Sequence, residues 1–281
     1  MRFFKYQGTG NDFIIFDGRE DGVFLSAREI EEVCDRHKGI GADGVIFALP
    51  SHAGDAAMRI FNADGSEAEM CGNGIRCLAK YLYERSGMFS QEMLIETPAG
   101  TKSLRLSVDD GMVAEVEVDM GLPDLAARDL PAPDDTSQPG VVTIDIAGGE
   151  VFRAFCLSMG NPHCVLFVED TSQAEVSRIG PLLETHELFP NRTNVEFAQV
   201  LDEHRIDLRV WERGVGETQA CGTGACAAAV AALHSGRCSG PVEVSLPGGY
   251  LRIAVYGNGH VLMTGPASEV FSGELSEGWR A

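Results

Sequence analysis

Hydrophobic and polar residues alternate along the chain in short runs separated by turn residues, and this pattern predicts more strands than helices. In the first half, the runs predict strands at Phe3–Tyr6, Phe13–Asp17, Val45–Leu49, Met58–Asn62, Leu104–Val108 and Val113–Asp119. Similar runs recur in the second half. Strands that follow one another directly favour antiparallel sheet wrapped on a helix over a doubly wound parallel sheet, so the expected fold class is α+β.

Three segments carry helix signals. A Ser-x-x-Glu capping box predicts a helix that begins after Ser26. A second helix is expected to begin just after Cys71 and to end near Gly87, and a third to begin just after Cys221 and to end near Gly236. Glycine is a common residue after the last helical turn because it adopts the left-handed backbone conformation.

The chain also repeats itself at a constant offset of 150 residues. Three motifs recur in this register: Gly10-Asn11 as Gly160-Asn161, Val45-x-Phe47-Ala48 as Val195-x-Phe197-Ala198, and Cys71-Gly72-x-Gly74 as Cys221-Gly222-x-Gly224. Glu67 and Glu217 match at the same offset. The sequence therefore predicts two similar lobes.

The second copy has too few residues to repeat the first in full, which predicts how the chain divides. We expect one lobe from residues 1–119 together with the tail 266–281, and another from residues 120–265. The proline-rich stretch Gly121 to Gly140 reads as the connection between them. The tail contains the apolar pair Val270-Phe271, which needs a surface to pack against. The first lobe or a partner subunit could supply that surface.

Composition narrows the classes of partner. The chain has 42 acidic and 22 basic residues, a formal charge of -20, which opposes binding to nucleic acid or anionic lipid. A zwitterionic small molecule fits this charge better than a polyphosphate. No apolar run has the length of a membrane span, and the first residues lack the features of a signal peptide, so we expect a cytoplasmic protein.

Eight cysteines are too few for a disulfide framework and form no Cys-x-x-Cys pair. Six of them are expected to be small buried hydrophobes: Cys34, Cys77, Cys156, Cys164, Cys226 and Cys238. Cys71 and Cys221 differ because both stand at a predicted helix start beside glycines. Unpaired N–H groups there lower a thiol pKa and also bind anions, so both residues are candidate bases next to a carboxylate site.

Inversion of a carbon centre needs a proton removed from one face and another supplied to the opposite face. Two lobes related by a pseudo-twofold axis would bring Cys71 and Cys221 to opposite sides of one substrate carbon, with no metal and no pyridoxal phosphate required. Two other classes stay open: a thiol oxidoreductase that uses the same two cysteines, and a non-catalytic pair of binding lobes. The Gly8-x-Gly10 pair lacks the third glycine of a dinucleotide site.

Several segments together resemble the diaminopimelate epimerase family. They are Lys5-x-x-Gly8-x-Gly10-Asn11-Asp12-Phe13, Phe61-Asn62-x-Asp64-Gly65-Ser66-x-x-x-Met70-Cys71-Gly72-Asn73-Gly74-x-Arg76, Gly160-Asn161-Pro162-His163, Arg192-Thr193-Asn194-Val195-Glu196-Phe197, and Trp211-Glu212-Arg213-Gly214-x-Gly216-Glu217-Thr218-x-Ala220-Cys221-Gly222-Thr223-Gly224. Proline racemases share the two-cysteine arrangement but have a motif similar to Met-Cys-Gly-His where this chain has Met70-Cys71-Gly72-Asn73. A racemase of that kind is therefore the alternative within the same class of enzymes.

The resemblance implies an isomerase that converts LL- to meso-diaminopimelate for lysine biosynthesis as a homodimer without a cofactor. It implies that Cys71 and Cys221 are the acid/base pair and that His163 and Glu212 modulate their pKa values. The residues implied to bind substrate are Asn11, Asn62, Gly72, Asn73, Asn161, Asn194, Glu212, Arg213, Gly222 and Thr223. Taken alone, Asn11 and Asn194 could be turn formers, His163 a core histidine and Arg213 a surface cation.

The two copies of the repeat differ at positions where an asymmetric substrate would need different side chains. Asn62, Ala63 and Phe13 correspond to Glu212, Arg213 and His163, so the extra polar groups lie in the second copy. Glu67 and Glu217 each precede a cysteine by four residues and are expected to cap the helix or the turn rather than to take part in catalysis. Gly44, the counterpart of Asn194, stands where several family members have Gln, so one side-chain contact is expected to be missing.

Overall fold

The computed structural model describes residues 1–20, 22–68, 70–146, 149–276 and 278–279. Contacts divide the chain into two units: unit 1 contains Met1–Asp119 and Thr264–Ala281, and unit 2 contains Met120–Met263. Residues 277, 280 and 281, which belong to the tail assigned to the first lobe, lie outside the described residues. In the described part of the chain, no helix has the length and hydrophobicity that a membrane crossing requires.

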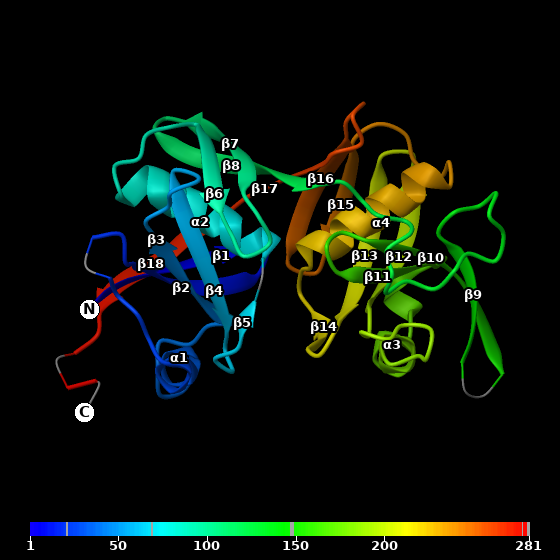
Figure 1. Ribbon diagram of the computed structural model, residues 1–281, viewed down its shortest axis with the longest axis horizontal. Coiled ribbons are helices and arrows are strands. Elements are labelled where there is room, and N and C mark those ends of the chain that lie inside the picture. Colours follow the sequence, from blue (N-terminus) through cyan, green and yellow to red (C-terminus); the bar gives the residue numbers. More distant parts are fainter. Residues whose placement is uncertain (21, 69, 147–148, 277, 280–281) are drawn as a thin grey trace. The chain divides into compact units, whose positions relative to one another are not determined.

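Unit 1 is a mixed sheet around one long helix. Its elements are β1 (Arg2–Gly8), β2 (Asn11–Asp17), α1 (Ala27–Cys34), β3 (Gly44–Leu49), β4 (Ala56–Asn62), β5 (Glu67–Ala68), α2 (Gly72–Arg85), β6 (Glu92–Glu96), β7 (Lys102–Asp109), β8 (Met112–Gly121) and β18 (Ser268–Glu274). Most neighbouring strands are antiparallel, whereas β2 with β3 and β4 with β6 run parallel. Helix α2 packs against β1, β2, β3, β4, β7 and β18 (Figure 1).

Unit 2 repeats this arrangement. Its elements are β9 (Val141–Ile146), β10 (Glu150–Ser158), β11 (Pro162–Phe167), the 3-10 turn η1 (Thr171–Gln173), α3 (Val176–Glu184), β12 (Asn194–Asp202), β13 (Arg205–Glu212), β14 (Gly216–Thr218), α4 (Gly222–His234), β15 (Val242–Leu246), β16 (Gly249–Val255) and β17 (Val261–Gly265). Strands β11 and β12 are parallel, as are β13 and β15. Helix α4 packs against β10, β11, β12, β13, β15 and β16.

The strand register shows that the two units are copies at the offset expected from the sequence. Phe13 pairs with Gly44 in unit 1, and His163 pairs with Asn194 in unit 2. Both helices are buried on nearly all sides: α4 consists mostly of small and apolar residues, whereas the buried residues of α2 also include Arg76 and Lys80. The α+β class is confirmed, as are the strands predicted in the first half.

The final strand completes unit 1. In unit 2, β9 precedes β10 along the chain and pairs with it in antiparallel fashion. In unit 1 the equivalent position beside β1 is taken by β18, from the end of the chain, which pairs Lys5 with Phe271 (Figure 1). Tyr6 donates a hydrogen bond to Glu269 at 2.9 Å across this pairing. Unit 1 thus needs the C-terminal segment to give β1 its second neighbour.

The helix boundaries follow local signals. Ser26 and Glu29 form the reciprocal capping box before α1, as predicted. Gly87 and Gly236, at φ values of 76° and 65°, follow the ends of α2 and α4 in the left-handed region. Helix α3 carries no such signal and contains Pro181, and the sequence analysis did not predict it.

Candidate active site

Cys71 and Cys221 are themselves the N-caps of the two buried helices. The Cys71 sulfur accepts a hydrogen bond from the backbone N–H of Gly74 at 3.4 Å, and the Cys221 sulfur accepts one from Gly224 at the same distance. Both residues have extended backbone conformations that point the thiol back over the first helical turn. Each unit therefore holds one thiol against the backbone N–H groups of a helix start.

In unit 1, three polar side chains meet beside Cys71. The Cys71 sulfur lies 3.7 Å from Asn11 Oδ1, which also accepts a hydrogen bond from Asn73 Nδ2 at 3.4 Å. Arg76 is fully buried, and it donates to Asn73 Oδ1 at 3.1 Å, to Thr9 Oγ1 at 2.7 Å and to the Gly72 carbonyl at 3.1 Å. This arginine fixes the amide of Asn73 so that its NH2 group faces Asn11.

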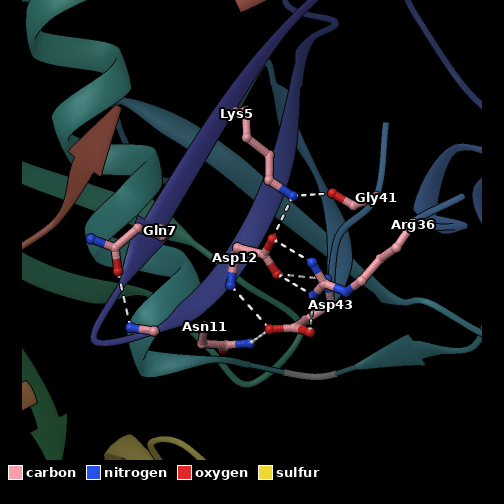
Figure 2. Close-up of polar contacts among 8 residues, drawn as sticks. Lys5, Gln7, Asn11, Asp12, Arg36, Gly41 and Asp43 are labelled. Atoms are coloured by element: carbon pink, nitrogen blue, oxygen red, sulfur yellow. Dashed lines mark hydrogen bonds and ion pairs between the residues drawn. The ribbon is translucent and has the colours of Figure 1, made fainter. Parts of the chain in front are cut away.

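A charged network fixes Asn11 from the other side (Figure 2). Asn11 Nδ2 donates to Asp43 Oδ2 at 2.8 Å, and Asp43 also accepts from Arg36 at 2.7 Å. Arg36 contacts Asp12, which forms a 2.6 Å ion pair with the buried Lys5. Burial alone would raise the pKa of Asp12, but hydrogen bonds from Arg36 and Lys5 outweigh it and hold that pKa well below its usual range. Asp12 therefore stays ionised, and Asp12 and Asp43 both act as acceptors in this network.

In unit 2, Cys221 lies in a more enclosed and more acidic environment. Its side chain is 5% exposed, and its sulfur lies 3.5 Å from Thr223 Oγ1. Burial raises the pKa of the Cys221 thiol well above its usual range, and the carboxylates of Glu212 and Glu196 raise it further. The lowered pKa predicted from the helix start is wrong for Cys221, because desolvation and two acidic neighbours outweigh the helix N–H groups.

His163 links Cys221 to a buried acid. Its Nδ1 lies 2.7 Å from Glu196 Oε1, and its Nε2 lies 3.0 Å from Asn161 Oδ1. Asn161 Nδ2 then donates to Thr223 Oγ1 at 3.4 Å. The structure thus brings His163, Asn161, Thr223 and Cys221 together, as the sequence predicts, and adds Glu196 to them.

A model of the family described as diaminopimelate epimerase matches residues 3–126 and 155–270 of this chain. The chain belongs to the diaminopimelate epimerase family. A relative named diaminopimelate epimerase from Pelotomaculum thermopropionicum is 50% identical, and one from Synechocystis sp. is 49% identical, each with 98% of both chains covered. The predicted enzyme class, an amino-acid epimerase and hence an isomerase, is confirmed.

Solved structures with lower identity share the fold of this epimerase family. A hydroxyproline epimerase from Agrobacterium vitis has a TM-score of 0.72 at 17% identity, with 98% of this chain and 90% of that chain covered. An epimerase, itself predicted as such, from Pseudomonas aeruginosa has a TM-score of 0.68 at 18% identity, with 98% of both chains covered. These likenesses support the two-lobe α+β fold.

Not every residue expected to bind substrate in this epimerase lies beside a thiol. Asn194 is 3% exposed; its Nδ2 donates to the Pro162 carbonyl, and its Oδ1 accepts from the Arg213 backbone N–H at 2.9 Å. The Arg213 side chain is exposed, and its Nη1 donates to the Asn191 carbonyl at 3.2 Å. Asn194 therefore holds the turn that presents Arg213.

Two acidic side chains differ from their expected roles. Glu67 pairs with Arg59 at 2.6 Å, and Glu217 pairs with Arg209 at 2.8 Å, the same contact at the repeat offset. Neither glutamate is the cap of the helix, because the cysteine sulfur already accepts the hydrogen bond of the first turn. Of the two predicted roles, a cap of the helix or of the turn, the helix cap is wrong, and each ion pair joins neighbouring strands.

Asn62 and Glu212 lie at equivalent ends of β4 and β13 but have different contacts. Asn62 donates to Ser66 Oγ at 3.0 Å within its own turn. Glu212 accepts from Thr218 Oγ1 at 2.5 Å, and its charge raises the pKa of Cys221. The placement of Glu212 agrees with the pKa-modulating role implied by the family.

The missing side chain at Gly44 has a steric cause. A β-carbon built on Gly44 would lie 2.4 Å from the carbonyl oxygen of Phe61 on the neighbouring strand. Any side chain there would require β3 and β4 to separate. The close approach of the two strands therefore requires glycine at position 44.

Three residues of this site carry no role in the sequence analysis: Arg76, Asp43 and Glu196. Arg76 and Glu196 stand inside the motifs quoted for the family, yet a charged residue in a motif does not show which neighbour it touches.

The six other cysteines are buried, as predicted. Burial raises the pKa of the Cys77 thiol to about 12, which makes it a poor resolving partner for Cys71 in the oxidoreductase alternative.

Proposed function

We propose that this chain is a diaminopimelate epimerase in which Cys71 and Cys221 invert the α-carbon of LL-diaminopimelate by a two-base mechanism. One cysteine thiolate removes the α-proton, so that a C–H bond breaks and an S–H bond forms. The other cysteine, as a thiol, gives its proton to the opposite face of the carbon and becomes the thiolate. The product is meso-diaminopimelate, and the protonation states of the two sulfurs have exchanged.

One observation carries this proposal: each unit has a cysteine as the N-cap of its buried helix, with the sulfur already accepting a backbone N–H. The backbone N–H groups of a helix start also suit the substrate carboxylate, which takes on enediolate character when the α-proton leaves. Gly72 and Asn73 provide such groups in unit 1, and Gly222 and Thr223 provide them in unit 2. This supports stabilisation of the developing charge without a metal or pyridoxal phosphate.

The distal end of diaminopimelate carries a second carboxylate and a second ammonium group. The exposed guanidinium of Arg213 suits the carboxylate, and the neighbouring Glu212 suits the ammonium. A proline racemase substrate has no such distal charges, so this pair favours diaminopimelate over the racemase alternative. We also propose a homodimer, which the family resemblance implies and which sedimentation of the purified protein would test. The cytoplasmic location stays a prediction.

The test uses the reduced protein, LL-diaminopimelate and deuterated water. We expect meso-diaminopimelate that carries α-deuterium from the wild type, and none from Cys71→Ala or Cys221→Ala. Cys226→Ala is the matched control, because it removes a buried thiol about a turn and a half along the helix that Cys221 caps and is expected to retain activity. Full activity of either catalytic-site variant, or conversion of proline but not of diaminopimelate, would contradict the proposal.

A further inference from the structure

Unit 2 contains a buried pair of titratable side chains on two adjacent parallel strands. His163 on β11 and Glu196 on β12 are both 0% exposed, and their side chains meet at 2.7 Å. The second carboxylate oxygen of Glu196 is buried without a hydrogen-bond partner in the described part of the chain. A buried polar pair with an unsatisfied oxygen costs stability relative to apolar residues of similar size.

The internal repeat shows that the fold does not need this pair. At the offset of 150 residues, His163 corresponds to Phe13 and Glu196 corresponds to Ile46 in unit 1. Phe13 is 3% exposed and Ile46 is 0% exposed, on the equivalent parallel strands β2 and β3. Unit 1 therefore builds the same part of the sheet from two apolar residues. The polar pair in unit 2 has a reason other than stability.

The pair leads to the thiol by two routes. The first is the series of contacts from His163 Nε2 to Asn161, from Asn161 to Thr223 and from Thr223 to the Cys221 sulfur, at 3.0, 3.4 and 3.5 Å. The second is packing, because a β-carbon at Gly224 would lie 2.9 Å from Glu196 Oε1. The carboxyl group thus lies against the helical turn that holds the Cys221 sulfur.

Both ring nitrogens of His163 face oxygen atoms, one from Glu196 and one from Asn161. For both contacts to be hydrogen bonds, Nε2 must carry a hydrogen that it donates to Asn161, and one further proton must lie between Nδ1 and Glu196. Burial raises the pKa of Glu196, which agrees with a carboxyl group that shares this proton. Without Glu196, Nδ1 would lose its partner and the ring could reverse its donor and acceptor sides.

We propose that Glu196 is a positioning residue of the epimerase: it holds His163 so that Nε2 donates to Asn161, which turns the Asn161 NH2 group towards Thr223 beside Cys221. The inference rests on the proposed function of Cys221. Glu196 acts through His163 and does not touch the substrate. The arrangement is specific to unit 2, since Asn11 in unit 1 is held by Asp43 instead.

The experiment is a double-mutant cycle of Glu196→Ile and His163→Phe, which introduces the residues of unit 1 at their equivalent positions. Glu196→Ile is expected to lower kcat/KM for LL-diaminopimelate about tenfold in the wild-type background. A loss of this size corresponds to the contribution of one hydrogen bond to a charged group. In the His163→Phe background the same change is expected to cost less than about twofold, because Glu196 has no ring left to hold. Glu196→Gln, which can still donate to Nδ1, is expected to recover most of the activity.

Equal losses in both backgrounds, or a Glu196→Ile variant with wild-type kcat/KM, would overturn the proposal. A second measurement does not depend on turnover: alkylation of Cys221 by iodoacetamide, with Cys71 in the same molecule as the standard. Glu196→Ile and His163→Phe are each expected to raise the Cys221 rate relative to that of Cys71, and the double variant no further. Glu196→Gln is expected to raise it less than Glu196→Ile, because it loses the charge that raises the Cys221 pKa but keeps the bond to Nδ1. An unchanged ratio in Glu196→Ile contradicts the positioning role. A wild type that fails to epimerise, with the ratios as expected, contradicts only the proposed function.

Discussion

Asp43 Oδ2 accepts a hydrogen bond from Asn11 Nδ2 at 2.8 Å (Figure 2), and this contact leaves Asn11 Oδ1 facing the Cys71 sulfur. A carboxylate can only accept, so it determines which side of the Asn11 amide faces the thiol. In unit 2 the equivalent Asn161 presents its oxygen to His163 and its NH2 group to Thr223. The two thiols therefore have oppositely oriented amides as neighbours.

The first prediction concerns Asp43. Asp43→Ala should lower kcat/KM for epimerisation about tenfold, because Asn11 loses a charge-assisted hydrogen bond and its amide can rotate. Asp43→Asn should lose less, since its Oδ1 can still accept from Asn11. The control is Glu32→Ala, which removes an exposed ion pair with Arg28 and should leave kcat/KM unchanged. An Asp43→Ala variant with wild-type turnover would show that the reaction does not depend on the hydrogen bond from Asn11 to Asp43.

The second prediction concerns thiol reactivity. A short pulse of iodoacetamide should label Cys71 before Cys221, because Cys71 is partly exposed whereas Cys221 is buried and its pKa is raised. The Cys221 rate should climb about tenfold per pH unit up to and beyond pH 9, as only the thiolate reacts. Peptide mass spectrometry gives both rates. Preferential labelling of Cys221 at neutral pH would contradict the raised pKa.

The third prediction concerns the ion pair between Lys5 and Asp12, whose side chains are 6% and 17% exposed. Lys5→Met should lower the free energy of unfolding by about 2 kcal/mol at pH 7, because the partly buried Asp12 carboxylate loses one of its two cationic partners and keeps Arg36. Urea denaturation measures the difference. Arg28→Ala, at an exposed pair, should change the midpoint within error.

The pH dependence of that difference follows from the direction of the pKa shift. The folded-state pKa of Asp12 is depressed, so its contribution is fully present above the unfolded pKa of about 3.9 and is lost as the pH falls through the folded value. The gap between wild type and Lys5→Met should therefore narrow below about pH 4. If the difference in unfolding free energy between wild type and Lys5→Met increased as the pH falls, the depressed pKa of Asp12 would be contradicted.

The fourth prediction separates two exposed glutamates from the chemistry. Glu67→Gln and Glu217→Gln should each retain epimerase activity within about threefold and change the free energy of unfolding by less than about 1 kcal/mol, the usual worth of a surface ion pair. Arg59→Ala and Arg209→Ala remove the partners and should behave alike. A loss of activity of 100-fold or more in either glutamate variant would assign it a catalytic part after all.

The fifth prediction tests the distal contact. Arg213→Ala should raise KM for diaminopimelate more than it lowers kcat, because a group that binds the non-reacting end contributes mainly to substrate binding. Arg213→Lys should recover part of the affinity, since lysine keeps the positive charge but lacks the two parallel N–H donors of the guanidinium group. The initial-rate dependence on substrate concentration decides between the two parameters. A pure kcat effect would place Arg213 at the reacting carbon.

The sequence by itself determined the features that depend on neighbours in the chain. The alternation of apolar residues predicts the strands, the Ser26 capping box predicts the start of α1, and Gly87 and Gly236 predict where the two long helices end. The offset of 150 residues predicts the doubled architecture, and it is confirmed by the strand pairs. These signals are local, because periodicity, capping and backbone preference act within a few residues.

The tertiary structure decided what depends on residues far apart in the chain. It placed β18 beside β1, Asp43 beside Asn11, and Glu196 beside His163. It also reversed the expected pKa direction of Cys221, because a helix start lowers a thiol pKa only where burial and nearby carboxylates do not outweigh it. Solvent exposure and the distance to other charges are set by the packed strands, and no pattern within one segment contains them.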